Sequence, residues 1–173
     1  VITENGNKVL GKKRGTIRTN NDLTIDADEF EYNKIPNVLN ARGKVIINDK
    51  LNNTIIYTEN ITYYKNQEKI FTEGKSKAIA DKTIINADEF EYHKLLNILN
   101  ASGNVKIDDY TKDQIIYTEN ITYLKNQEKI FTTGKTKTII EKKYNFYSND
   151  TLFFKNEQIL SSYDKSYLTD DQN

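Results

Sequence analysis

The sequence predicts an all-β protein in which units of about 30 residues stack around a narrow, V-shaped interior. Three observations lead to this class. The chain repeats itself, since residues 27–77 match residues 87–137 at 35 of 51 positions. Apolar and polar residues alternate along most segments, which is typical of half-buried strands and not of helices. The alternation also changes phase at the same place in every unit, so each unit must bend there.

A finer repeat of about half the 60-residue period becomes visible when similar residues are allowed to match. In each unit an apolar residue is followed two positions later by a small residue, and then by an acidic or amide residue. A second apolar residue and an aromatic ring follow, and beyond a polar gap lie a third apolar residue, a small residue and a glycine. We predict that the apolar columns line the interior with Ile25, Phe30, Leu39, Ile56, Ile61, Ile70, Ile85, Phe90, Leu99, Ile116, Ile121 and Ile130.

Each unit is expected to fold at two bends. The first lies at Ala27 and Asp28, where the apolar parity switches and one extra residue would turn the following side chains inward again. We expect the acidic column that begins with Asp28 to accept hydrogen bonds from backbone donors freed at the bend, or to face water. A glycine in mid-strand otherwise costs stability, so its recurrence indicates the second bend or a place where a bulkier side chain cannot be accommodated. It recurs as Gly43, Gly74, Gly103 and Gly134.

The pattern leaves two alternatives for the interior. The apolar content is only 36%, so the core is either thin or open. An open groove could hold acyl chains by burying them, at roughly 0.8 kcal/mol per methylene. A closed β-solenoid whose interior is filled by its own side chains explains the pattern equally well. The ring column also has two interpretations, packing within the sheet or lining a ligand path, and consists of Tyr32, Tyr63, Tyr92 and Tyr123.

Composition excludes several classes of function. The 25 basic residues balance the 25 acidic ones and are scattered, which argues against a nucleic-acid partner. No apolar run approaches the roughly 20 residues of a membrane-spanning helix. The chain has no cysteine and a single histidine, His93, whose counterpart in the earlier copy is Asn33. We therefore expect no metal site, no cofactor and no enzymatic activity.

We expect three segments along the chain. Residues 1–14 form a leader or an edge segment, residues 15–168 a single repeat domain, and residues 169–173 a tail that could lead to a following domain. The chain begins at Val1 without the regions of a signal peptide, so we expect either a removed signal peptide or an excised domain. The first strands should leave an unpaired edge that docks a homologous domain through Thr16, Ile17 and Leu23. A proline at Ile17 should remove a donor from this edge.

The unit from Ile85 to Ile107 reads I-x-A-D-x-F-x-Y, a polar turn, and then L-x-A-x-G-x-V-x-I. This unit resembles the repeat of the OstA-like family of lipopolysaccharide transport proteins, and the resemblance extends from Gly15 to about Leu168. It implies a bent, V-shaped β-jellyroll of the β-taco type, with an open hydrophobic groove that conducts the acyl chains of lipid A. The second and fourth copies depart from the pattern with Thr58 and Thr118 in place of alanine.

The resemblance also implies a setting and partners. The expected function is that of a non-enzymatic lipid-conducting module in the periplasm of a Gram-negative bacterium, associated with the outer membrane. Its partners would be lipopolysaccharide and homologous β-jellyroll domains joined edge to edge. The segment from Tyr147 to Asp170 resembles the passage by which one family member continues toward an outer-membrane β-barrel in the same chain. The alternative function is that of a structural β-solenoid segment in a surface fibre or adhesin.

Overall fold

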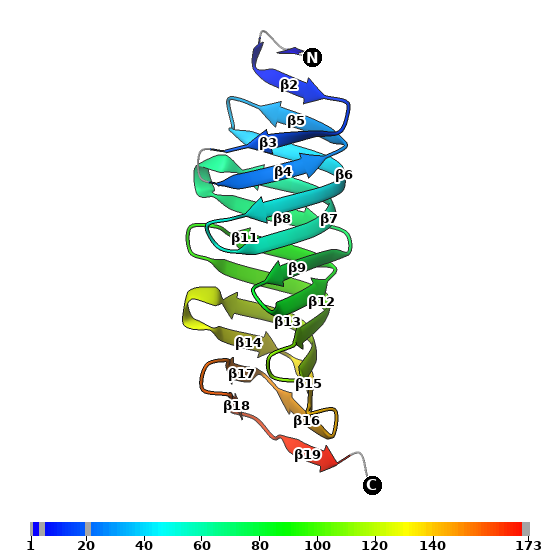
Figure 1. Ribbon diagram of the computed structural model, residues 1–173, viewed down its shortest axis with the longest axis vertical. Helices are drawn as coiled ribbons and strands as arrows, with labels where there is room; N and C mark the ends of the chain where they lie inside the picture. Colours follow the sequence, from blue (N-terminus) through cyan, green and yellow to red (C-terminus); the bar gives the residue numbers. More distant parts are fainter. Residues whose placement is uncertain (1, 4–5, 20–21, 171–173) are drawn as a thin grey trace.

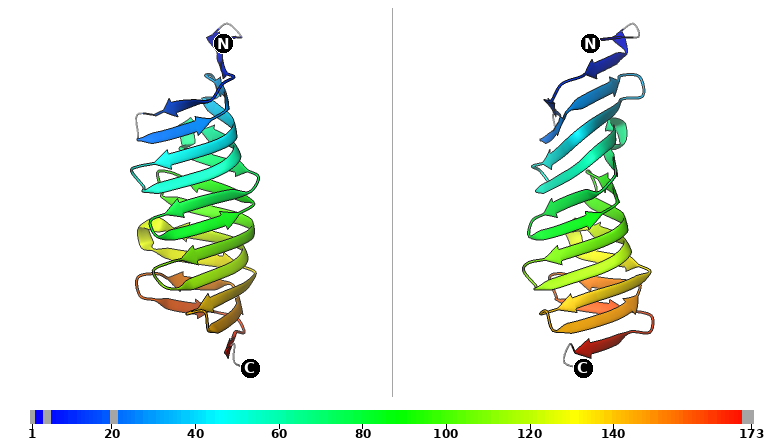
Figure 2. Two further views of the ribbon diagram at one scale, coloured as in Figure 1. Left: turned by 45° about the vertical axis from the view of Figure 1, so that its right-hand side comes forward. Right: turned by 90° about the vertical axis from the view of Figure 1, so that its right-hand side faces the viewer.

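The computed structural model describes residues 2–3, 6–19 and 22–170, and these residues form one antiparallel sheet that is folded along its length (Figure 1). The strands stack as rungs along the long axis of the molecule, and the two termini lie at opposite ends of the stack (Figure 2). No α-helix occurs in the described part of the chain, whose only helical elements are short 3₁₀ turns. The predicted fold class is therefore confirmed.

Strand pairing divides the sheet into two walls, here called wall A and wall B. Four long strands run through both walls: β6 (Val38–Asp49), β7 (Thr54–Tyr64), β12 (Ile98–Asp109) and β13 (Gln114–Leu124). Wall A also contains β1 (Ile2–Thr3), β2 (Lys8–Gly11), β5 (Glu29–Asn33), β8 (Lys69–Glu73), β11 (Glu89–His93), β14 (Lys129–Thr133), β17 (Thr151–Phe154) and β18 (Ile159–Ser162). Wall B also contains β3 (Gly15–Arg18), β4 (Leu23–Ala27), β9 (Ser76–Ala80), β10 (Thr83–Ala87), β15 (Lys135–Ile140), β16 (Tyr144–Asn149) and β19 (Tyr167–Asp170).

The long strands show how one wall turns into the other. The first half of β6 pairs with β5, and its second half pairs with β4. Between the halves, the register of β6 with β7 shifts between Arg42 and Val45. Strands β12 and β13 repeat the same shift between Ser102 and Val105. A bulge of this kind lets a strand change direction without losing its partner. At the other end of each wall the strands are joined by tight turns, including the 3₁₀ turns η2 (Lys65–Gln67) and η3 (Lys125–Gln127).

The two predicted bends are one bend, because the acidic column and the glycine column lie side by side along a single seam, here called the corner seam. The backbone N–H of Asp28 donates to the carbonyl oxygens of Arg42 (3.1 Å) and Gly43 (3.0 Å), and that of Asp88 donates to Gly103 (2.9 Å). The glycines have left-handed backbone angles, with φ of 77° at Gly43 and 74° at Gly103. The two columns are far apart within a unit, so the sequence pattern predicted separate corners, but strand pairing brings them together.

At Asp28 and Asp88 the acidic side chains accept hydrogen bonds, but from side-chain donors and not from the predicted backbone donors. Asp150 Oδ1 accepts from the backbone N–H of Gly134 at 2.8 Å. Asp88 Oδ2 accepts from Asn104 Nδ2 at 2.7 Å, and Asp28 Oδ1 accepts from Arg14 Nη1 at 2.9 Å. Side-chain donors therefore bind the column acids at the bend, whereas the backbone donor is bound by Asp150, the residue after Asn149 of the column.

The small residues beside the corner seam explain why threonine replaces alanine in alternate units. Ser76 Oγ donates to Thr58 Oγ1 (2.9 Å) and is bonded to Thr72 Oγ1 (2.8 Å). In the later copy Thr136 makes the equivalent contacts with Thr118 (3.1 Å) and Thr132 (2.8 Å). All six of these hydroxyl groups are buried and paired, so the substitution exchanges an apolar contact for a satisfied hydrogen-bond cluster at little cost.

We predict that Gly103→Ala destabilises the protein more than Gly134→Ala does. Both glycines have positive φ, and an L-residue in such a backbone costs roughly 1–2 kcal/mol. A Cβ on Gly103 would in addition lie 2.5 Å from Asp88 Oδ2 and 2.9 Å from Asp88 Cβ, whereas a Cβ on Gly134 would meet no atom within 4 Å. Urea unfolding should show a further loss of about 1–3 kcal/mol for Gly103→Ala, as expected for overpacking. Equal losses in the two variants would contradict this account of the corner seam.

Candidate functional site

The residues predicted to line the interior do come together between the two walls. Eleven of the twelve are buried and belong to a single hydrophobic cluster, and the remaining one, Phe30, is partly buried and packs against it. None of the eleven exposes more than 3% of its surface. The interior is therefore continuous from one repeat to the next, as the alternation of the sequence predicts.

Of the two alternatives that the sequence left open, the structure shows the filled interior. Apolar side chains from both walls belong to one buried cluster, for example Phe90 of wall A and Ile85 of wall B, which are at most 2% exposed. Burying each large apolar side chain contributes roughly 1.5–3 kcal/mol to folding, so the stack is held together mainly by this core. A lipid would have to displace these side-chain contacts or enter at an end of the stack, where the apolar core ends.

The interior is least complete at the two ends of the stack. At the amino-terminal end a hollow of about 280 Å³ lies between β2 and β3, with Val9, Ile17, Phe30 and Tyr32 among its lining residues. At the carboxyl-terminal end Leu168, which pairs with Phe146, is 59% exposed. Apolar surface thus continues out of the core at both ends.

The tyrosine rings of the ring column pack within the sheet. Their hydroxyl groups lie near the strand ends of wall A that are opposite the corner seam. Tyr63, Tyr92 and Tyr123 are each at most 1% exposed. Burial is the largest cause of the raised pKa of all three phenols, followed by the neighbouring carboxylates. Their hydroxyl groups donate to Glu68 Oε2 (2.8 Å), Asp49 Oδ2 (2.8 Å) and Glu128 Oε2 (3.2 Å), respectively. The column therefore packs the core, and its hydroxyl groups hold the carboxylates near the ends of the strands.

A column of lysines that was not predicted from the sequence lies on the side of the molecule opposite the corner seam, where the two walls of the V meet. In every unit a lysine stands two residues after the ring, in the pattern ring-x-Lys. This recurrence was the available signal, but a lysine in a polar turn is normally solvated. Lys34 is exposed, the other members are partly or fully buried, and the column consists of Lys34, Lys65, Lys94, Lys125 and Lys155.

The later lysines of this column link wall A to wall B. Asn52 Nδ2 in a wall B turn donates to the backbone oxygen of Lys94 at 3.0 Å. Lys125 Nζ lies 3.2 Å from Asp81 Oδ2 and donates to the backbone oxygens of Asn52 and Asn53, the latter at 3.2 Å. Together with the hydrogen bond from Tyr92 to Asp49, which also crosses from wall A to wall B, these bonds close the open side of the V and act as a latch. We refer to Lys94, Lys125, Lys155 and their partners as the lysine latch.

The third link of the lysine latch is a buried cluster around Lys155. Lys155 Nζ donates to Thr83 Oγ1 at 2.6 Å and lies 3.5 Å from Asp109 Oδ2 and 3.2 Å from Glu128 Oε2. Asp109 occupies the place of Asp49 in the earlier copy, where a tyrosine hydroxyl is its partner. Phe153 has no hydroxyl group to offer, so the ammonium group of Lys155 neutralises Asp109 instead.

The lone histidine contacts a surface ion pair. His93 Nε2 lies 2.7 Å from Glu91 Oε1, which also pairs with Lys69 at 3.0 Å, and these partners keep the pKa of Glu91 below its usual value. Within residues 2–3, 6–19 and 22–170, no group of three or more metal-ligating side chains is arranged to hold a metal ion. The described part of the chain also has no helix with the length and apolarity needed to span a membrane.

The three residues assigned to the docking edge occupy different places. Thr16 and Ile17 lie on β3, which among the described strands pairs only with β4 and is therefore the first strand of wall B. Leu23 lies one strand further in and is fully buried. Strand β2 extends wall A at the same end and pairs with β5.

The fold and the interior define a stacked-repeat β-jellyroll with a filled apolar interior, a corner seam on one side and a lysine latch on the other. No protein-family model matches the chain, and no curated protein matches it. Among the solved structures that match is the crystal structure of LptH, the LptA-homologous periplasmic component of the conserved lipopolysaccharide transport device from Pseudomonas aeruginosa. The two chains are 16% identical over 85% of this chain and 93% of LptH, with a TM-score of 0.35. A similarity at this level does not indicate what this chain binds.

We predict that Lys155→Met destabilises the protein by about 3–5 kcal/mol, because it leaves the buried Asp109 carboxylate unpaired. The Lys155 side chain is 11% exposed and that of Asp109 is 4% exposed, so water cannot fully replace the ammonium group. The matched control is Lys142→Met, which removes a lysine that is 79% exposed and pairs with Asp113 at 3.4 Å. This control should change the free energy of unfolding by less than about 0.5 kcal/mol. Similar thermal unfolding of the two variants would show that the latch contributes nothing.

Proposed function

We propose that this protein is a non-enzymatic lipid-conducting module whose interior accepts the acyl chains of lipopolysaccharide. The observation that carries the proposal is the uninterrupted apolar interior, which runs through every unit from Leu23 to Phe153. Acyl chains are stabilised by burial at roughly 0.8 kcal/mol per methylene, so they could exchange with side-chain contacts of the same kind. The resemblance of the repeat to the OstA-like family agrees with this use.

The filled interior requires that the walls separate before a lipid can pass along it. The corner seam holds one side through backbone hydrogen bonds, whereas the opposite side is held by side chains of the lysine latch. Because the bonds of the latch can break without disturbing any strand pairing, the walls would open there. Opening would begin at the amino-terminal end, where the hollow beside Phe30 already interrupts the core and Lys34 is exposed.

We further propose that the amino-terminal end docks a homologous β-jellyroll domain through β3. Thr19 N–H donates to the carbonyl oxygen of Leu23 at 2.9 Å. In an antiparallel pair the bonded partners recur at every second residue, so the N–H of Ile17 points toward Ile25 of β4. The free donors are therefore those of Thr16 and Arg18. The proline test suggested by the sequence at Ile17 would break the sheet and not the docking edge.

The proposed setting is the periplasm of a Gram-negative bacterium, in a bridge that leads toward the outer membrane. We also propose that an outer-membrane β-barrel follows this domain in the full-length chain. That part of the proposal rests on the resemblance of the segment from Tyr147 to Asp170 alone. Its strands β16 and β19 pair over four residues, and β19 is the last strand of wall B among the described residues.

The filled interior also favours a second candidate, a structural β-solenoid segment of a surface fibre or adhesin. In such a protein the core would never open, and the lysine latch would serve only to fix the stack. The two candidates differ in one measurable property, which is whether a lipid reaches the interior.

A photo-crosslinking amino acid at Phe30 should form adducts with lipopolysaccharide, and the same amino acid at Phe131 should not. Phe30 lines the hollow at the amino-terminal end, whereas Phe131 lies on the outer face of wall A and is 38% exposed. Both positions carry phenylalanine, so p-benzoylphenylalanine makes the same change at each. Adducts would be detected by a mobility shift after irradiation with purified lipopolysaccharide. Absence of adducts at Phe30, or equal yields at both positions, would favour the structural solenoid.

Thr16→Pro should abolish the joining of domains and leave thermal stability unchanged, because the donor that it removes points away from β4. Ile17→Pro should lower the melting temperature, because the donor that it removes belongs to the pairing with Ile25. A second copy of the chain can stand in for the homologous domain, and light scattering at increasing concentration would measure the joining. If Thr16→Pro associates as the unaltered protein does, the docking edge lies elsewhere.

A further inference from the structure

The outer face of wall B carries a row of side chains that serves neither the interior nor the corner seam. Cross-strand register aligns one residue from each of eight neighbouring strands. Seven steps of about 4.8 Å make this row roughly 33 Å long. We call it the tyrosine–lysine row, and it consists of Tyr57, Lys77, Asn86, Lys106, Tyr117, Lys137, Tyr147 and Tyr167.

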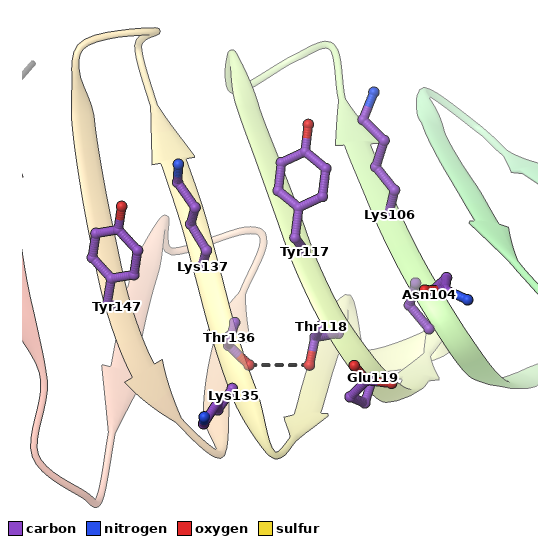
Figure 3. Close-up of a pocket in the computed structure, with 10 residues that line it drawn as sticks. Asn104, Lys106, Tyr117, Thr118, Glu119, Lys135, Thr136, Lys137 and Tyr147 are labelled. Carbon is purple, nitrogen blue, oxygen red and sulfur yellow. Dashed lines mark hydrogen bonds between the residues drawn. The ribbon is translucent and has the colours of Figure 1, made fainter.

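From Lys106 to Tyr147, ammonium groups and aromatic rings alternate along this row. In Figure 3 the rings of Tyr117 and Tyr147 alternate with the stems of Lys106 and Lys137, and all four side chains point the same way along the strands. Lys137 Nζ lies 5.5 Å from the centroid of the Tyr147 ring, and Lys106 Nζ lies 6.0 Å from that of Tyr117. Tyr117 remains 39% exposed, so ring surface is available to a ligand.

The row borders two hollows that are related by the 60-residue repeat. The first has a volume of about 450 Å³ (Figure 3), and its charged lining residues are Lys106, Lys135, Lys137 and Glu119. The second has a volume of about 280 Å³, and its charged lining residues are Lys44, Lys75, Lys77 and Glu59. Each hollow thus has three lysines and one glutamate, although the chain as a whole is neutral.

This positive charge distinguishes wall B from wall A. A hollow of about 510 Å³ on the outer face of wall A has Glu89 and Glu91 as its charged lining residues. Among the described residues, no carboxylate lies within ion-pair distance of Lys77, Lys135 or Lys137. These three ammonium groups are therefore available to an anionic ligand.

We propose that the outer face of wall B binds a linear acidic polysaccharide that lies across the strands. The apolar faces of sugar rings pack on tyrosine rings, and carboxylate or phosphate groups on the sugars pair with the intervening ammonium groups. The two hollows are separated by four strand steps, or about 19 Å. A polymer with regularly spaced charges occupies both hollows at once and gains from that multivalency, whereas a single anionic sugar reaches only one.

Two other polyanions fit this face less well. Six lysines beside two glutamates form a weaker field than the dense basic patch expected of a nucleic-acid site. A bilayer surface is flat, and it would not reach the floors of the hollows, which are formed by Val105, Thr118 and Thr136 in the larger one. A thin chain with polar and apolar faces fits between the side chains.

The test is a titration of the folded protein with an oligogalacturonate long enough to span both hollows. Binding would be followed by calorimetry and by tyrosine fluorescence, which no tryptophan obscures because the chain has none. We expect binding that weakens as the salt concentration rises. Lys137→Gln should weaken it by about fivefold, the effect of losing one exposed charge contact. Tyr117→Leu should weaken it by roughly tenfold through the loss of ring stacking.

Matched controls come from the outer face of wall A. Lys129 Nζ lies 5.2 Å from the Phe154 ring, as Lys137 does from a tyrosine ring on wall B, so Lys129→Gln removes an equivalent lysine. Phe131 is 38% exposed, which closely matches Tyr117, so Phe131→Leu removes an equivalent ring. Both controls should bind oligogalacturonate with unchanged affinity. The fully methyl-esterified oligosaccharide has the same sugars without the charges and should not bind.

Several outcomes would overturn the proposal. These are no binding of oligogalacturonate, equal losses in the wall A controls, or equal binding of the methyl ester. Tighter binding of single-stranded DNA or of vesicles containing anionic phospholipid would assign this face to those partners instead. None of these outcomes depends on whether a lipid enters the interior.

Discussion

Each chain segment that leaves one wall enters the other through the same bend, so the hydrogen bonds of the corner seam set the geometry of the whole stack. A sheet that bends sharply must either break its ladder or satisfy the freed backbone groups in another way. Here the N–H of Asp28 and of Asp88 reaches back to the glycine carbonyl of the next strand. Left-handed glycines keep the ladder in place on both sides of the bend. Both walls can then pack against each other across a thin interior.

Much of this arrangement could be predicted because the repeat makes every feature visible several times. Ile25, Ile56, Ile85 and Ile116 each predict an inward position, and their agreement defines the interior better than any one of them. The corner seam was harder, because Asp28 and Gly43 meet only through strand pairing, which a single chain pattern does not specify. Whether the interior is open or filled depends on the distance between the walls, and no residue column encodes that distance.

The lysine column shows a different limit of sequence reasoning. Lys155 stands in a polar turn, where nearly every lysine is solvated, and only the opposite turn of wall B makes it buried. A buried ion pair adds little net stability compared with apolar packing, but it penalises any arrangement that leaves one partner alone. The latch therefore contributes more to specifying one arrangement of the two walls than to the stability of that arrangement. Its side-chain bonds also make it the weaker side of the V.

The near identity of the two 60-residue copies has a consequence for the way the chain folds. Strands β7 and β13 are alike in sequence, so a nascent chain could pair a strand with the wrong copy and still bury a similar core. The turns at 50–53 and 110–113 are among the least repeated segments, and Asn52 and Asn53 of the first are partners of the lysine latch. A copy that slipped by one repeat would lose these contacts while keeping its hydrophobic pairing. The variable turns thus make contacts that form only when each strand pairs within the correct copy. These contacts favour the native register over the slipped one.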